Sequence, residues 1–265
     1  MIKVYLNGKS FIEDNSAFLD LNKYMSSLFY IDSKLLNETN KTNYAIKVNI
    51  DDKTLLAIKV EPYNLLLYGD KECLEELLLF IKENDYEIDG IMCSIDIGDY
   101  LISKSTYLID KEYYKSIGMD FMEARDFLEK SSSIVTIPSL SDVDAIYDLS
   151  INFLKDCGLL DKPNKDKIKN NISNYRIIRI NDEIVSMASL SKETDNSYKI
   201  SHVYTKPQYR GSGFARKIVN NIKNEILKMG KYATLNVDQK NPISNRLYAS
   251  LGFKKVFSQG IYLVK

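Results

Sequence analysis

The chain has 265 residues, which is long for one ordinary domain and comfortable for two. Its 36 basic and 36 acidic side chains cancel, so no overall charge attracts nucleic acid or an anionic lipid surface. The N-terminus lacks the apolar segment of a signal peptide, and no apolar run approaches the roughly 18 residues that span a bilayer. We therefore expect a cytoplasmic protein with neither a membrane nor a nucleic-acid partner.

The first half of the chain alternates β-rich and helical segments and ends at a polar interruption. Lys130 is followed by three serines, a composition typical of a boundary between domains. We predict an N-terminal α/β domain over residues 1–130 and a second domain over residues 131–265. The elements predicted in the first half are strands near 45–49, 54–60, 65–68 and 88–93, and a helix near 72–84.

The second half predicts a fuller alternation of strands and helices. A strand over 134–137 precedes a helix with Ser141 as its N-cap and Gly158 at its end, and a second amphipathic stretch begins near Asn164. Then follow a hairpin of strands 176–180 and 184–190, a strand over 198–205, a helix over 215–229, a strand over 233–237, a helix over 242–251 and two closing strands. This order predicts an α/β fold organised by a mixed sheet.

A glycine-containing loop joins the strand over 198–205 to the next helix. Strict alternation along that strand places Tyr198, Ile200, His202 and Tyr204 on one face. The loop follows directly, and its glycines let the backbone approach a ligand closely, while the first N–H groups of the helix have no internal partner. Such a helix start binds phosphate, so we predict a pyrophosphate-bearing cofactor.

The spacing within this loop excludes two classes of phosphate site. A nucleoside triphosphate loop needs G-x-x-x-x-G-K-[ST], which does not occur here. A dinucleotide fingerprint needs a third glycine or an alanine where this chain has Arg216. Arg210 and Arg216 are instead expected to add charge-assisted bonds to phosphate.

The first half of the chain repeats part of the same order without the glycine loop. At the corresponding place it has Tyr68-Gly69-Asp70-Lys71-Glu72, whose acidic side chains at a helix start repel phosphate. We interpret the N-terminal domain as a degenerate duplicate of the second.

Cysteine and histidine are too few for a metal centre. Cys73, Cys93 and Cys157 are far apart and lie among apolar or helical neighbours, so we expect buried free thiols in a reducing compartment. His202 is the only histidine of the chain, and we predict no metal site.

Two motifs at the expected separation resemble the GNAT superfamily of N-acetyltransferases. The coenzyme A loop of that superfamily, [QR]-x-x-G-x-[GA], is matched by Gln208, Gly211 and Gly213. A later segment, N-x-x-[SA]-x-x-[LIV]-Y-x-x-x-G-[FY], is matched by Asn241, Ser244, Leu247, Tyr248, Gly252 and Phe253. The likeness covers residues 134–265 well and the first 130 poorly, and it looks like a bacterial group that carries an extra N-terminal domain.

The resemblance implies a splayed central sheet and acetyl-CoA as cofactor. It assigns the pantetheine arm to the backbone of Val203, Tyr204 and Thr205, the pyrophosphate to Arg210, Gly211, Ser212, Gly213, Phe214 and Ala215, and further cofactor contacts to Asn241 and Ser244.

The resemblance also implies catalytic roles. Tyr248 is expected to protonate the departing sulfur as general acid, with a tyrosine packed on the core as the alternative. Many relatives use a glutamate of the central strand as base, whereas this strand has Ser201 and His202. His202 is the candidate base by its ordinary pKa near 6.5, unless it is only a packed core side chain.

The expected reaction is direct transfer of an acetyl group to a primary amine of a small molecule, a peptide or a protein. The alternative is a non-catalytic module that binds acyl-CoA for regulation. Either form is compatible with a monomer or a homodimer.

Overall fold

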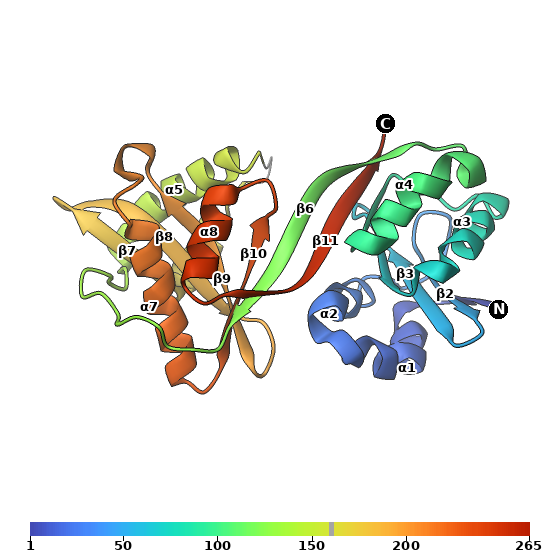
Figure 1. Cartoon of the computed structure of the whole chain (residues 1–265), viewed down its shortest axis with the longest axis horizontal. Helices are drawn as coiled ribbons and strands as arrows, with labels where there is room; N and C mark the ends of the chain where they lie inside the picture. The colour runs from blue at the N-terminus through green and yellow to red at the C-terminus, as the bar shows by residue number, and fades with distance from the viewer. Residues whose placement is uncertain (159–161) are drawn as a thin grey trace. The chain divides into compact units, whose positions relative to one another are not determined.

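The computed structural model of the protein describes residues 1–158 and 162–265 (Figure 1). The chain forms two compact units. The first comprises Met1–Met119 and Phe257–Lys265, and the second comprises Asp120–Val256. Among the described residues, no helix has both the length and the apolar character needed to cross a membrane.

The N-terminal unit has helices on both faces of its strands (Figure 1). In the sheet the order is β1-β2-β3-β4-β5-β11, in which β4 and β5 are parallel and the other pairs given by residue register are antiparallel. One core packs α3 and α4 on the sheet, and a second packs α1 and α2 on it. The bounds are β1 Ile2–Tyr5, α1 Gly8–Leu19, α2 Lys23–Asp32, β2 Tyr44–Ile50, β3 Lys53–Lys59, β4 Leu65–Gly69, α3 Leu74–Glu83, β5 Gly90–Ser94, α4 Ile95–Ile109, β6 Tyr113–Ala124 and β11 Lys254–Val264.

The C-terminal unit is built in the same way. Strands β10, β9, β8 and β7 are neighbours in that order, with β9 and β10 parallel. Helices α7 and α8 pack on one face, and α5 and α6 pack on the other (Figure 1). The bounds are α5 Val143–Asp156, α6 Lys165–Asn170, β7 Tyr175–Ile180, β8 Glu183–Lys192, β9 Ser197–Thr205, α7 Phe214–Lys228, β10 Tyr232–Asp238 and α8 Pro242–Ser250.

Both units therefore run through two helices, three antiparallel strands, a helix, a parallel strand and a helix. The predicted α/β class and the GNAT-like character of the N-terminal domain agree with this repetition. Each repeat leaves one parallel pair at its centre, β4 with β5 and β9 with β10.

The compact units differ from the predicted division at residue 130 in two places. The end of the chain belongs to the first unit because β11 pairs with β5, with Gly260 opposite Cys93. The segment that contains Lys130 belongs to the second unit because asparagines of α7 bind its backbone. Asn221 accepts from the Ser132 N–H at 2.7 Å and donates to its carbonyl at 2.9 Å, and Asn224 donates to the carbonyl of Glu129 at 2.8 Å.

Several predicted details were wrong. The strand expected over 134–137 is a single bridge between Thr136 and Ile177, because Pro138 has no N–H to continue a ladder. The helix cap is Ser139, which forms a capping box with Asp142, and not Ser141. The two closing strands are one strand, β11. Cys73 and Cys93 are buried free thiols as expected, but Cys157 is exposed at the end of α5.

Candidate active site

The two parallel strands at the centre of the C-terminal unit separate along their length. β9 and β10 pair at three positions, from Ser197 with Tyr232 to Lys199 with Thr234. Both strands then continue without this pairing, β9 to Thr205 and β10 to Asp238. The backbone of β9 from residue 200 onward is consequently not paired with β10, so its N–H and C=O groups on that side can bind a ligand.

A β-bulge at His202 changes the faces that the β9 side chains occupy. The register with β8 shifts between Met187, which is opposite Tyr204, and Ser189, which is opposite Ser201. His202 has φ of +52°, a left-handed conformation in which histidine is one of the more tolerated residues. The extra residue bends the strand locally and interrupts the ladder.

The bulge overturns the predicted alternation. Ile200 packs in the core under α7 and α8, but Tyr204 packs in the opposite core under α5 and α6. Val203 packs toward α7 and α8, while the ring of His202 lies 5.4 Å from that of Phe153 of α5. The side chains expected on one face are therefore divided between two.

His202 is oriented by a serine of β8. The hydroxyl of Ser189 lies 3.0 Å from Nδ1 of His202 and 3.3 Å from the carbonyl oxygen of Ser201. Burial, followed by the charge of Lys167, lowers the pKa of His202 below its ordinary value of 6.5. The imidazole is consequently neutral at pH 7.

The predicted glycine loop has the backbone conformation that requires glycine. Gly211 has φ of +82° and Gly213 has φ of +75°, and Gly213 is the residue before the first turn of α7. A Cβ atom at either glycine would meet nothing within 4 Å, so the space over both is open. Phe214 anchors the start of the helix by packing its side chain on the core.

The two arginines expected to bind phosphate are engaged with carboxylates instead. Arg210 lies 2.5 Å from Asp156 of α5 and donates to the carbonyl of Thr205 at 3.1 Å. Arg216 binds Glu129 and donates to the hydroxyl of Ser250 at 2.6 Å. Because both ion pairs are exposed, each holds its arginine only weakly.

The predicted cofactor contacts of β9 are partly occupied. The carbonyl of Tyr204 accepts from the Ser186 hydroxyl at 3.0 Å, and the carbonyl of Thr205 accepts from Arg210. Each carbonyl oxygen has a second lone pair. Val203 follows the bulge directly, so its backbone takes less part in the regular ladder with β8 than that of Tyr204 or Thr205.

Helix α8 carries the second motif. Asn241 caps the helix, because its side-chain oxygen accepts from the N–H of Ser244 at 3.0 Å, and its amide nitrogen is left to donate to a ligand. The other end of α8 is fastened by Lys223 of α7, which is fully buried and donates to the carbonyl of Leu251 at 2.9 Å.

Tyr248 of α8 is largely buried, with 7% of its surface exposed. Burial raises the pKa of its hydroxyl to about 12, against the opposing effect of a hydrogen bond with Ser244. Cys157 also raises the pKa of this hydroxyl, so the end of α5 and the inner face of α8 are close together. Tyr248 packs on Phe253 at 6.1 Å between ring centroids, which shows that it is a core residue as well.

The structure thus gathers residues of β9, the loop before α7 and α8 around the end of the parallel pair. Sequence reasoning missed Ser189, which orients His202, and it assigned Ser244 to the cofactor without its bond to Tyr248. The contact between this serine of β8 and His202 becomes visible only when the bulged register is known. In the described ranges, no three His, Cys, Asp or Glu side chains gather where they would hold a metal ion.

Comparison with known proteins gives the fold of the chain and a family match for part of it. Residues 144–253 match the model of the acetyltransferase (GNAT) family. No curated protein matches the chain. Among solved structures, a GNAT-family acetyltransferase from Colwellia psychrerythraea is similar with a TM-score of 0.65 and 12% identity, over 100% of this chain and 99% of that one.

Two further structures share the fold. A GCN5-related N-acetyltransferase from Sphaerobacter thermophilus has a TM-score of 0.58 and 14% identity, over 83% of this chain and 80% of that one. A tandem GNAT protein from the clavulanic acid biosynthesis pathway has a TM-score of 0.58 and 8% identity, over 100% of this chain and 98% of that one. Since the matched segment contains both motifs and lies within the C-terminal unit, that unit carries a domain of the acetyltransferase (GNAT) family.

Proposed function

We propose that the C-terminal unit transfers an acetyl group from acetyl-CoA directly to a primary amine. The observation that carries this proposal is the separation of β9 from β10, with the glycine loop at the end of one strand and Tyr248 after the other. The arrangement offers an extended backbone for pantetheine, a helix N-terminus for pyrophosphate and a hydroxyl for the sulfur.

The loop before α7 fits a pyrophosphate. The open space over Gly211 and Gly213 lets phosphate oxygens reach the N–H groups of the first helical turn. The Cβ atom of any other residue would take up part of this space. Phe214 and Ala215 supply N–H groups of this turn, and Ser212 supplies one from the loop before it. Arg210 joins them by exchanging its exposed pair with Asp156 for a phosphate oxygen.

Pantetheine is expected along Val203, Tyr204 and Thr205 on one side and the amide of Asn241 on the other. Acetyl-CoA supplies the thioester whose acetyl group is transferred. The proposed donor to the thioester carbonyl oxygen, as negative charge develops on it, is the N–H of Val203 or Tyr204 next to the bulge.

Tyr248 acts on the departing sulfur. Its raised pKa keeps the hydroxyl protonated at neutral pH, so it donates a hydrogen bond to the sulfur as the thiolate forms. Ser244 holds the hydroxyl in place from the preceding turn of α8.

His202 is the proposed base, and Ser189 selects its tautomer. A carbonyl oxygen only accepts, so the single proton of Ser189 goes to the carbonyl of Ser201. The hydroxyl oxygen of Ser189 then accepts from Nδ1–H of His202, which leaves the lone pair on Nε2. Neutral His202 can therefore take the proton that the attacking amine loses.

The test is thiol release from acetyl-CoA across a panel of small primary amines and peptides with free N-termini, beside a direct measurement of CoA binding. We expect saturable, amine-dependent release for at least one class of acceptor. Tight CoA binding without release for any acceptor would refute transfer and support a regulatory acyl-CoA module.

A further inference from the structure

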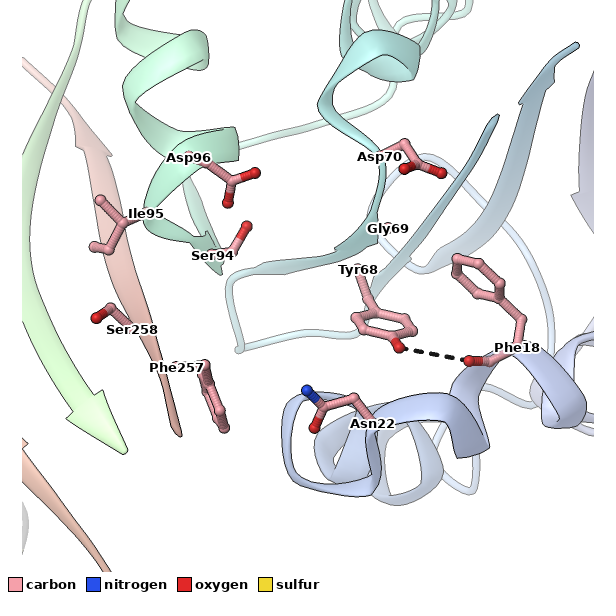
Figure 2. A pocket seen from close by; sticks show the side chains of 10 residues that line it. All are labelled: Phe18, Asn22, Tyr68, Gly69, Asp70, Ser94, Ile95, Asp96, Phe257 and Ser258. Atoms are coloured by element: carbon pink, nitrogen blue, oxygen red, sulfur yellow. Dashed lines mark hydrogen bonds between the residues drawn. The ribbon is translucent and has the colours of Figure 1, made fainter. Parts of the chain in front are cut away.

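The N-terminal unit contains a cavity at the place that corresponds to the site of the C-terminal unit. Strands β4 and β5 pair in parallel at two positions, Leu65 with Ile91 and Leu66 with Met92, and then separate. A cavity of about 530 Å³ lies at their carboxyl ends, between the start of α4 and the turn after β4 (Figure 2). This volume is within the range of small-molecule sites.

The charged groups that line the cavity are both acidic. Asp70 follows β4, and Asp96 lies in the first turn of α4. Figure 2 shows the two carboxylates on the two walls that β4 and β5 lead into. Neither forms an ion pair with a described residue, although Asp70 accepts from the N–H of Thr54 at 2.9 Å.

These carboxylates make the cavity unsuitable for a cofactor pyrophosphate. In the C-terminal unit, α7 follows β9 after Gly213 and has no acidic residue in its first turn, whereas α3, which follows the equivalent strand β4, comes after Asp70 and has Glu75 and Glu76 in its first turn. In the N-terminal unit, Asp96 occupies the positive end of the α4 dipole, and the lining contains no lysine or arginine. An anionic ligand would meet two negative charges with no cationic side chain among the lining residues.

Aromatic rings form much of the rest of the lining. The ring of Tyr68 stands in the cavity beside Phe18, with 5.2 Å between ring centroids, and Phe257 of β11 lies across from them (Figure 2). Tyr68 is held in place, since its hydroxyl points to the carbonyl of Phe18 at 3.5 Å. Aromatic faces attract cations, and desolvated faces attract them more strongly.

We propose that this cavity binds a small organic cation through a primary ammonium group. Asp70 and Asp96 provide the countercharge, the hydroxyl of Ser94 provides a further acceptor, and the aromatic rings contact the carbon skeleton. A primary ammonium ion is preferred to a trimethylammonium ion because only the former donates hydrogen bonds to the carboxylates and to Ser94. This proposal stands independently of the reaction proposed for the C-terminal unit.

The experiment uses the full chain and calorimetric titration with putrescine, spermidine and choline at low and moderate salt. We expect saturable binding of the primary amines, weaker binding of choline, and affinity that falls with salt. Asp70→Asn and Asp96→Asn should each weaken binding by about tenfold or more, because each removes a charge and keeps the shape. Asp99→Asn is the matched control, since Asp99 is an exposed acid of the same helix α4 outside the lining.

Two outcomes would overturn the proposal. One is the absence of saturable binding by any of the three probes in the wild-type chain. The other is binding that both cavity variants leave unchanged, which would place the amine elsewhere, including the acceptor site of the C-terminal unit. Thermal unfolding of each variant shows whether it has kept its fold. If one variant has lost its fold, the binding measured with the other still tests the proposal.

Discussion

Replacement of Tyr248 by phenylalanine removes one oxygen atom beside the proposed position of the sulfur. With a pKa of about 12, the hydroxyl is ionised in roughly one molecule in 10⁵ at pH 7. Complete proton transfer to a thiolate of ordinary pKa near 8.5 is uphill by roughly 5 kcal/mol, so Tyr248 acts chiefly as a hydrogen-bond donor. A bond to a charged acceptor contributes about 1.5–3 kcal/mol, and we therefore expect kcat to fall about 10- to 150-fold.

The assay for Tyr248→Phe is thiol release under single-turnover conditions, with CoA affinity measured separately. Affinity should change little, because the ring that packs on Phe253 remains. Tyr113→Phe is the control, because it removes another buried tyrosine hydroxyl, in the core of the N-terminal unit. An unchanged single-turnover rate in Tyr248→Phe, or an equal loss in Tyr113→Phe, would refute the assigned role.

Three further predictions concern the same unit. Gly213→Ala should raise the Kd for CoA about tenfold and lower stability by about 1–2 kcal/mol. The control is Gly230→Ala at the other end of α7, which has a similar φ of +69° and equally open space, so it should lower stability by a similar amount and leave the Kd unchanged. Equal Kd values in both variants, measured by titration, would contradict pyrophosphate binding by the glycine loop. Maleimide should label exposed Cys157 selectively, and saturating CoA should slow the labelling several-fold, as followed by mass spectrometry; labelling at the same rate with and without CoA would show that the sulfur does not lie near α5. The acid limb of the pH profile of kcat/KM should lie below pH 6.5, because protonation of His202 removes the proposed base and burial lowers its pKa. His202→Asn should abolish that limb, since asparagine tolerates the left-handed backbone at this position. An acid limb that persists in this variant would exclude the base role.

The sequence was informative wherever backbone conformation and chemistry depend on the same residue. Gly211 and Gly213 were predicted to permit a turn, and both have positive φ. From α5 to α8, the strands and helices were predicted within a few residues, because their apolar periodicity is regular. Arg210 was expected at phosphate, but its partner Asp156 comes from another helix, and such a contact depends on packing that no local pattern encodes.

The N-terminal unit shares its order of strands and helices with the C-terminal unit but not the residues at the corresponding site. Both units separate a parallel pair of strands at the same point of the fold. The residues that follow the equivalent strands β9 and β4 differ, with Gly211 and Gly213 in one unit and Asp70 in the other. The absence of a glycine loop was visible in the sequence, but the cavity was not, because Phe18 and Phe257 reach it from opposite ends of the chain.

The β9 bulge is the feature that strict alternation could not predict, and the proposed chemistry depends on it. Without the extra residue, His202 would lie on the same face as Ile200, in the core beneath α7 and α8. With it, His202 faces α5, where Ser189 can orient it, and the neighbouring N–H groups leave the ladder. One inserted residue thus positions both the proposed base and the proposed donors for the carbonyl oxygen.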